Sequence, residues 1–309
     1  MKKPNFFILG APKCGTTSLA AWLSGHPKIF VCPIKEPHYF NFDYGLRRTK
    51  TLNDYERLFK TADNQHLAVG EASVRYLYSR CAVPNILQYN PDAKFIVLIR
   101  DPVEMAYSLH AQSLYNGSEN VLDFERAWEI QAVRMYGKFI PRGCPDPQLL
   151  QYGMTCRVGE QLRLLFNYVP KDRVLILALH HLQNNPRASY LKTLGFLGVD
   201  DDERLEFPVF NSSKKRRLTA LVKSTQLANA ILSDIGITNL RIGLTKWLNE
   251  KAWSQLERPP LRPSFRAELT AYFLSDVLLL EKLTGYDLSS WKPPHNDSRP
   301  DIAHQISCE

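Results

Sequence analysis

Four short apolar runs stand out along the chain, and they predict buried β-strands. Each run is four to six residues long, is rich in branched or aromatic side chains, and ends beside a polar residue or glycine. The runs are Asn5–Leu9, Leu67–Gly70, Phe95–Ile99 and Val174–Leu179. Strands that are apolar along their whole length are typical of parallel sheets covered on both faces.

The stretches between these runs carry apolar residues at helical spacing. The predicted helices are Ser18–Ser24, Asp54–Phe59, Val103–Leu114, Leu122–Tyr136, Arg157–Tyr168, Arg187–Leu197 and Ser264–Leu283. Strands that alternate with helices predict a three-layer α/β fold, in which helices flank a central parallel β-sheet. We expect one domain over residues 1–291, with a mostly helical segment Lys214–Leu283, and a polar tail over residues 292–309.

The composition narrows the class of protein. A net charge of +8 indicates an anionic partner, either nucleic acid, a membrane surface or a phosphorylated small molecule. No apolar run reaches the roughly 18 residues of a membrane helix, so no membrane span is expected. The apolar stretch after Lys3 stops at Pro12, too early for a secretory signal. Six cysteines without a C-x-x-C pair predict a reduced, cytoplasmic protein without a zinc site.

The first predicted strand runs into a glycine turn with the spacing of a phosphate-binding loop. Four residues separate Gly10 from Gly15, and Thr16 and Thr17 open the predicted helix. Backbone N–H groups of such a loop bind a phosphate together with the positive end of the helix dipole. An ATP-binding loop has a lysine where this chain has Thr16, and Lys13 is the only lysine of this loop. A tight turn without a ligand is the alternative interpretation.

A second anion-binding element follows the third predicted strand. Asp101, Pro102 and Glu104 suit the N-cap, N1 and N3 positions of a helix. Arg100 then lies at the carboxyl end of the strand, where ligands bind in open α/β sheets. Ser108 follows about two helical turns later. Arginine and serine both suit a phosphate, and an ion pair of Arg100 with Asp101 or Glu104 is the alternative.

Together these residues resemble the sulfotransferases that use 3′-phosphoadenosine 5′-phosphosulfate (PAPS), in the heparan-sulfate-type and bacterial branch. The segments that carry the resemblance are Pro12–Leu19, Lys35–Phe40, Ile99–Ser108, Ser213–Arg216 and Leu283–Leu288. The resemblance implies a P-loop-type fold. It also implies transfer of the sulfuryl group of PAPS to an acceptor hydroxyl, or less favourably an amine, which releases adenosine 3′,5′-bisphosphate.

The resemblance assigns the donor-binding residues. They are Lys13, Cys14, Gly15, Thr16, Thr17, Ser18, Arg100, Ser108, Ser213, Lys214, Lys215 and Arg216. Lys13 is expected to neutralise charge on the leaving phosphate, and Arg100 with Ser108 to bind the 3′-phosphate. No metal is expected, because Lys13, the loop amides and the helix terminus supply the positive field.

The resemblance also assigns the base. Glu36 is expected to take the proton of the acceptor, and partial burial is expected to raise its pKa toward the working pH. His38 is the rival base, or it orients the acceptor. A surface ion pair with Lys35 is the alternative for Glu36. His110 is expected to pack or cap on the helix after Arg100.

Two departures from the family pattern bear on the acceptor. Lys215 replaces a glycine of the fourth matching segment, and Ala72 follows Glu71 where the polysaccharide-modifying members carry a lysine. The second departure favours small bacterial-type acceptors over glycosaminoglycans, although a small molecule, a lipid or a carbohydrate all remain open. Glu71 is expected either to line the acceptor site or to be structural.

Two other functions compete with sulfuryl transfer. The first is a P-loop kinase that uses ATP and Mg²⁺, which the missing Gly-Lys and Walker-B aspartate disfavour. The second is nucleic-acid binding through Lys214–Arg217, which is otherwise a solvated charged face. No nucleic-acid partner is expected, because the other basic residues are dispersed. The sequence carries no signal for the oligomeric state.

Overall fold

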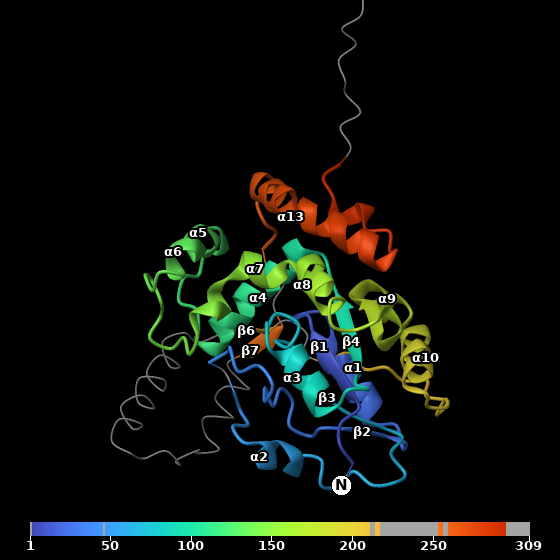
Figure 1. Cartoon of the computed structure of the whole chain (residues 1–309). Coiled ribbons are helices and arrows are strands. Elements are labelled where there is room, and N and C mark those ends of the chain that lie inside the picture. Colours follow the sequence, from blue (N-terminus) through green and yellow to red (C-terminus); the bar gives the residue numbers. More distant parts are fainter. Residues whose placement is uncertain (1, 46, 211–213, 217–252, 256–258, 295–309) are drawn as a thin grey trace, which may run out of the picture.

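The computed structural model describes residues 2–45, 47–210, 214–216, 253–255 and 259–294. Its centre is a sheet of five parallel strands in the order β2-β3-β1-β4-β5 (Figure 1). The strands are β1 (Phe6–Gly10), β2 (Ile29–Val31), β3 (Ala68–Ala72), β4 (Lys94–Ile99) and β5 (Val174–Ala178). All four predicted strands are present. The three-residue β2 was not predicted, because so short a run carries no detectable period.

Helices cover the sheet, as the alternation of elements predicts. Their bounds are α1 (Thr16–Ser24), α2 (Leu52–Arg57), α3 (Ala82–Tyr89), α4 (Pro102–Asn116), α5 (Phe124–Glu129), α6 (Gln131–Arg134), α7 (Tyr152–Cys156), α8 (Val158–Leu165), α9 (Leu179–Asn184), α10 (Pro186–Leu197) and α13 (Pro263–Thr284). Short 3₁₀ turns lie at Pro147–Leu150, Lys171–Arg173 and Ser289–Trp291. Among the residues that the structure describes, no helix is both long and apolar enough to cross a bilayer.

The core lies where the central strands meet the helices. Every residue of β1 is buried, because β3 and β4 pair with it on either side and helices cover the sheet. Helices α1 and α10 meet through Phe207, whose ring lies 5.2 Å from that of Trp22 and 5.3 Å from that of Tyr190. The fully apolar pattern of the predicted strands is thus explained by burial on both faces.

The long helix α13 is fixed to α8 by a buried carboxylate. Asp276 accepts hydrogen bonds from the backbone N–H groups of Gly159 and Glu160, each at 2.9 Å. These N–H groups belong to the first turn of α8 and have no partner inside that helix. A side chain of α13 therefore caps another helix, which ties the C-terminal segment to the rest of the fold.

Two predicted helical segments differ from the structure. The predicted helix Leu122–Tyr136 is broken at Ile130 into α5 and α6. The first and last residues of the predicted helix lie outside both of them. The predicted mostly helical segment Lys214–Leu283 contains two short antiparallel strands, β6 (Lys214–Arg216) and β7 (Trp253–Gln255). A strand of three residues is too short to show an alternating apolar pattern, so its sequence cannot be distinguished from part of a helical pattern. Residues 217–252 of the expected domain and 295–309 of its tail lie outside the described residues.

Candidate active site

A cleft of about 1230 Å³ opens at the carboxyl edge of the sheet. Its walls come from the loops after β1, β4 and β5 and from the segment that follows β2. It brings together nine residues that the sequence singled out: Lys13, Gly15, Thr16, Thr17, Ser18, Glu36, His38, Arg100 and Ser108. Ser213 lies outside the described residues, and so do the side chains of Lys214, Lys215 and Arg216.

The β1–α1 loop has the shape of an anion-binding turn. Gly15 is the N-cap residue of α1 and has a φ of 89°, in the left-handed region that favours glycine. A Cβ at Gly15 would come within 2.9 Å of Leu179 Cδ1, so the Leu179 side chain would have to move, and the positive φ would still be strained. Gly15 has no side chain with which to cap the first N–H groups of α1, where the positive end of the helix dipole lies. These features fit a phosphate or sulfate group.

Lys13 and Arg100 place two cations beside this helix end. Lys13 has a φ of 64°, and its Nζ donates to Gln112 Oε1 at 3.1 Å. The Arg100 guanidinium donates to the Lys13 carbonyl at 3.2 Å and lies 3.6 Å from Glu104 Oε2. The alternative ion pair with Glu104 is therefore present. Arg100 forms this ion pair and also lines the cleft, as does Ser108.

The predicted helix start at Asp101 is confirmed. Its carboxylate accepts hydrogen bonds from the N–H of Val103 at 2.8 Å and of Glu104 at 3.5 Å. Pro102 occupies the first turn of α4, where its missing N–H costs nothing. This local capping sets the direction of α4, which carries Ser108 toward the cleft.

The side chains of Cys14 and Ser18, two of the predicted donor-binding residues, make contacts within the protein. Cys14 is fully buried, its Sγ lies 3.9 Å from Met105 Sδ, and burial raises the pKa of its thiol to about 12. Only its backbone faces the loop. Ser18 Oγ accepts from the N–H of Phe210 at 3.1 Å, which holds the segment around Phe207 against α1. Trp22, Phe207 and Phe210 form an apolar part of the cleft that the sequence did not reveal.

The segment from Lys35 to Phe40, called here the Lys-Glu loop, lines the cleft through Lys35, Glu36 and His38. Glu36 and His38 have φ values of 59° and 52°, a region that non-glycine residues rarely adopt. Such conformations persist only where surrounding contacts impose them, and they gather at functional sites. Lys35 Nζ donates to Thr17 Oγ1, which joins this loop to the start of α1.

Glu36 is an ionised carboxylate between two basic groups. Its oxygens lie 3.5 Å from Lys35 Nζ and 3.4 Å from His38 Nε2. Burial raises its pKa, but the His38 hydrogen bond and the Lys35 charge outweigh burial and lower it to about 2. The prediction that the pKa of Glu36 would rise toward the working pH is therefore wrong, because His38 and Lys35 outweigh burial. The ion pair with Lys35, the alternative interpretation, is present as well.

His38 lies behind Glu36. Its side chain is 2% exposed against 29% for Glu36, and its ring stands edge-on to Tyr76 at 6.1 Å. Its Nδ1 is buried and has no hydrogen-bond partner among the described residues. Glu36 therefore presents the more accessible group to the cleft, and His38 supports it from behind.

Comparison with known proteins decides the family. The family model described as the sulfotransferase domain matches residues 3–230. The chain belongs to the sulfotransferase family. It is 28% identical to carbohydrate sulfotransferase 15 of Mus musculus over 249 residues, which cover 63% of this chain and 44% of that protein.

Two further similarities extend over most of this sulfotransferase. It is 26% identical to the bifunctional heparan sulfate N-deacetylase/N-sulfotransferase 4 of Mus musculus over 299 residues, 93% of this chain and 31% of that protein. The crystal structure of a sulfotransferase from Alicyclobacillus acidocaldarius superposes with a TM-score of 0.68 at 25% identity, covering 94% of this chain and 99% of that one. The chain spans less than half the length of these two curated relatives.

The structure adds cleft residues that the sequence analysis of this sulfotransferase missed. Arg75 is 8% exposed, lines the cleft, and donates to the Tyr44 hydroxyl at 3.1 Å. Arg48 and Tyr44 also line this side. Arg75 follows β3 by three residues, so the rule that ligands lie at the carboxyl ends of strands was a usable signal for it.

Glu71 does not line the cleft, so of its two interpretations the structure supports the structural one. It is fully buried and accepts hydrogen bonds from Ser73, Tyr76 and Tyr55. Burial raises its pKa to about 7 against the effect of these hydrogen bonds, and the charge of Glu36 adds to the rise.

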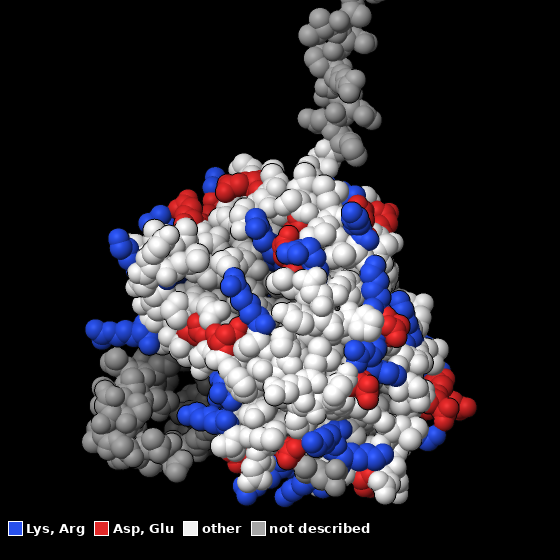
Figure 2. All heavy atoms as spheres, in the orientation of Figure 1, with Lys and Arg blue, Asp and Glu red and all other residues white. Residues whose placement is uncertain are grey.

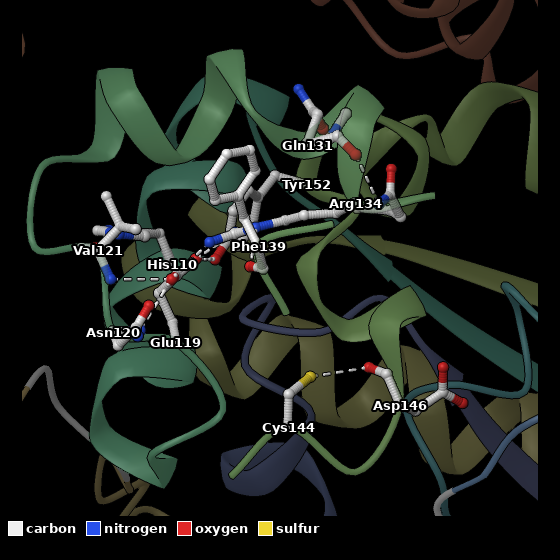
Figure 3. Close-up of polar contacts among 12 residues, drawn as sticks. His110, Glu119, Asn120, Val121, Gln131, Arg134, Phe139, Cys144, Asp146 and Tyr152 are labelled. Carbon is white, nitrogen blue, oxygen red and sulfur yellow. Dashed lines mark hydrogen bonds and ion pairs between the residues drawn. The ribbon is translucent and has the colours of Figure 1, made fainter. Parts of the chain in front are cut away.

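The segment between α4 and α7 completes the cleft and is anchored by a buried ion pair (Figure 3). Arg134 donates to both oxygens of Glu119, at 2.6 and 2.8 Å, and Tyr152 donates to the same carboxylate at 2.7 Å. Neither charged side chain is exposed. Burial raises the pKa of Glu119, but the Arg134 and Tyr152 hydrogen bonds lower it below its usual value. His110 is buried and bonds to the Val121 carbonyl at 2.9 Å, so of its two expected roles, packing and capping, the structure shows packing.

Charge is distributed rather than concentrated on the face shown in Figure 2. There, Lys and Arg side chains alternate with Asp and Glu and form no continuous stripe. In the described ranges, no three His, Cys, Asp or Glu side chains gather in a way that would hold a metal ion.

Proposed function

We propose that this sulfotransferase transfers the sulfuryl group of PAPS to an acceptor hydroxyl and releases adenosine 3′,5′-bisphosphate. The observation that supports it is the shared cleft. An anion-binding helix end with Lys13, a second cation at Arg100 and an accessible carboxylate at Glu36 all line it. In-line transfer breaks the bond between sulfur and the phosphate oxygen and forms a bond between sulfur and the acceptor oxygen. The acceptor proton goes to Glu36.

The donor has a place along the β1–α1 loop. The 5′-phosphosulfate is proposed to lie at the N-terminus of α1, where Lys13 and the loop amides meet the charge that develops on the leaving phosphate. Arg100 and Ser108 are proposed to bind the 3′-phosphate, since both line the same cleft. The apolar patch of Trp22, Phe207 and Phe210 suits the adenine. The roles of Ser213, Lys214, Lys215 and Arg216 stay predictions.

Glu36 remains the proposed base because of its accessibility. A carboxylate with a pKa of about 2 is ionised at every physiological pH, so it is always ready to accept a proton. It is a weak base in the free enzyme, and proton transfer is therefore expected late, after the bond to sulfur has begun to acidify the acceptor hydroxyl. The His38 side chain is less exposed and is proposed to orient Glu36.

The acceptor side suits a carbohydrate that carries an acidic group. The names of the relatives include carbohydrate and heparan sulfate, which favours a carbohydrate over a lipid or another small molecule. Arg75 faces this side, and a guanidinium pairs well with a carboxylate or sulfate. An amine as acceptor is the second choice. A reduced, cytoplasmic location is also proposed, because the five cysteines of the described residues are unpaired.

A thermal-shift experiment tests the donor and the kinase alternative. Adenosine 3′,5′-bisphosphate at about 100 times its Kd is expected to stabilise the protein by about 2.7 kcal/mol. ATP with Mg²⁺ is expected to give a smaller shift. Arg100→Ala should abolish the preference for the bisphosphate over adenosine 5′-phosphate. The two nucleotides differ in the 3′-phosphate, and this variant lacks the side chain proposed to bind that group. A larger shift with ATP–Mg²⁺ than with the bisphosphate would favour a kinase instead.

A further inference from the structure

A buried hydrogen-bond network lies behind the Lys-Glu loop, outside the cleft. Its centre is Glu71, near the end of β3. Ser73 Oγ donates to Glu71 Oε2 at 2.6 Å, while the hydroxyls of Tyr76 and Tyr55 donate to Oε1 at 2.9 and 3.1 Å. A fully buried carboxylate with three hydroxyl donors is costly to build, because burial disfavours its charge. The reaction proposed above assigns it no role.

Two of these hydroxyls also hold the Lys-Glu loop. Ser73 Oγ accepts the backbone N–H of His38 at 3.2 Å. The Tyr76 oxygen accepts those of Tyr39 at 2.9 Å and Phe40 at 3.3 Å. Three consecutive amides of the loop are therefore bound by side chains that Glu71 itself orients. These contacts lie at or just after Glu36 and His38, the two loop residues with a left-handed backbone conformation.

The charge state of Glu71 determines how these hydroxyls are oriented. An ionised carboxylate only accepts hydrogen bonds, so the protons of Ser73 and Tyr76 point to Glu71 and their lone pairs face the loop. A protonated Glu71 becomes a donor itself, and one of the three hydroxyls must then turn. Tyr76 cannot receive this proton, because its two lone pairs already accept the amides of Tyr39 and Phe40.

The surroundings of Glu71 bring its titration into the neutral range. Tyr55 faces it from α2, and Ser73 and Tyr76 from the turn after β3. The charge of Glu36 acts on Glu71 from the Lys-Glu loop. Burial raises the pKa of Cys32, which follows β2, and the charge of Glu71 adds to that rise. Burial raises the pKa of Glu71 to about 7 despite the three hydroxyl donors.

We propose that Glu71 is a positioning residue for the proposed sulfuryl transfer. Its ionised carboxylate orients Ser73 and Tyr76, and these hold the Lys-Glu loop so that Glu36 and His38 keep their geometry. The inference rests on the proposed function. It concerns the pH at which that function operates rather than the identity of the donor.

Activity and stability should respond to Glu71 in opposite directions. Activity is expected to rise as Glu71 ionises around pH 7. A carboxyl whose pKa is raised by folding contributes stability below its unfolded pKa, near 4.3, and that contribution is lost as the pH rises through about 7. The Glu71 contribution to stability therefore falls over the same pH range in which activity rises.

The experiment measures kcat against pH at saturating PAPS and acceptor. Wild type is expected to show an acid limb near pH 7. Glu71→Gln should lose this limb and lower kcat by about ten- to a hundredfold, because a misplaced base costs rates of that size. Tyr76→Phe should lower kcat similarly. The KM for PAPS and the thermal shift with adenosine 3′,5′-bisphosphate should be unchanged in both, which shows that the donor site is intact.

Two further tyrosine variants keep the test decisive. Tyr89→Phe is the matched control, since its hydroxyl bonds Glu56 at 3.1 Å and its ring packs in the same aromatic cluster. It should leave the acid limb in place. Tyr55→Phe removes a donor to Glu71 without touching the loop, so it should move the limb to higher pH. It also serves if Glu71→Gln does not fold.

The outcomes separate this inference from the proposed function. An unchanged acid limb in Glu71→Gln, or in Tyr55→Phe if Glu71→Gln does not fold, would overturn the positioning role. Loss of the limb in Tyr89→Phe as well would also overturn it, because the effect would then be one of general packing. Wild-type protein that binds the bisphosphate but transfers nothing from PAPS to any acceptor would instead overturn the proposed reaction.

Discussion

The β1–α1 loop and the Lys-Glu loop line one cleft, but different interactions hold them. The first is set by neighbours in sequence: a buried strand, Gly15 in a left-handed conformation, and the start of α1. The second is held by side chains that follow β3, more than 30 positions away, through Ser73 and Tyr76. The β1–α1 loop, in the donor half of the cleft, is thus shaped mainly by local structure, although Arg100 reaches it from 87 positions away. The Lys-Glu loop, in the half that carries the proposed base, is held by long-range contacts.

This difference changes the chemistry of each half. In the donor half, Lys13 of the β1–α1 loop lines the cleft, and its role toward the donor stays a prediction. Glu36 in the other half has its pKa lowered to about 2, because His38 and Lys35 both favour its ionised form. Variants on the two sides should therefore separate donor binding from proton transfer.

The largest effect is expected for Glu36→Gln. Loss of the proposed base should lower kcat by about 10²–10⁴-fold, the usual contribution of general base catalysis. Binding of adenosine 3′,5′-bisphosphate, measured by thermal shift or calorimetry, should be unchanged. Because the pKa of Glu36 is about 2, its ionisation should give no limb in the pH profile above about pH 4.

The matched control for this variant is Glu160→Gln, a half-buried glutamate that pairs with Arg163 on α8. It should behave as wild type. Near-normal kcat in Glu36→Gln, together with an inactive His38→Ala, would move the base assignment to His38.

The sequence predicted the donor half better than the base half, for physical reasons. Two separate sequence patterns, each within about ten residues, give the strand before Gly10 with Lys13, and Arg100 with the helix cap at Asp101. Glu71 shows no such pattern, because its partners include Tyr55 on α2. Nor does the sign of a pKa shift follow from burial alone when a neighbour such as His38 donates a hydrogen bond.

Other elements escaped the sequence for related reasons. The helix predicted over Leu122–Tyr136 is interrupted, and the side chain of Arg134 turns inward to Glu119. An arginine on an amphipathic pattern is expected to face solvent, and only the tertiary partner reveals otherwise. Arg75 was missed because a single basic residue after a strand carries no motif.

The next largest effect is expected for Lys13→Ala. Removing one cation from the leaving phosphate should lower kcat by about 10²–10³-fold. Unlike Glu36→Gln, it should also weaken binding of the bisphosphate, since Lys13 lies in the donor half. Lys192→Ala, on α10, is the control that removes a lysine without touching the cleft lining. Unchanged bisphosphate affinity in Lys13→Ala would show that this side chain acts outside the donor half.

The smallest effect is expected for Arg75→Lys, which tests where the two halves meet. Arg75 lines the cleft but lies beside Glu36 and Tyr44, so we assign it to the acceptor. Because lysine loses the planar two-point contact, the KM for an acceptor with a carboxylate should rise about tenfold. The KM for PAPS and the KM for a neutral analogue of that acceptor should stay the same. The control is Arg80→Lys, at an exposed arginine of the same segment, which should leave the KM for PAPS and for both acceptors unchanged. A rise in the KM for PAPS alone would place Arg75 in the donor half, and the boundary between the two halves would then run between Arg75 and Glu36.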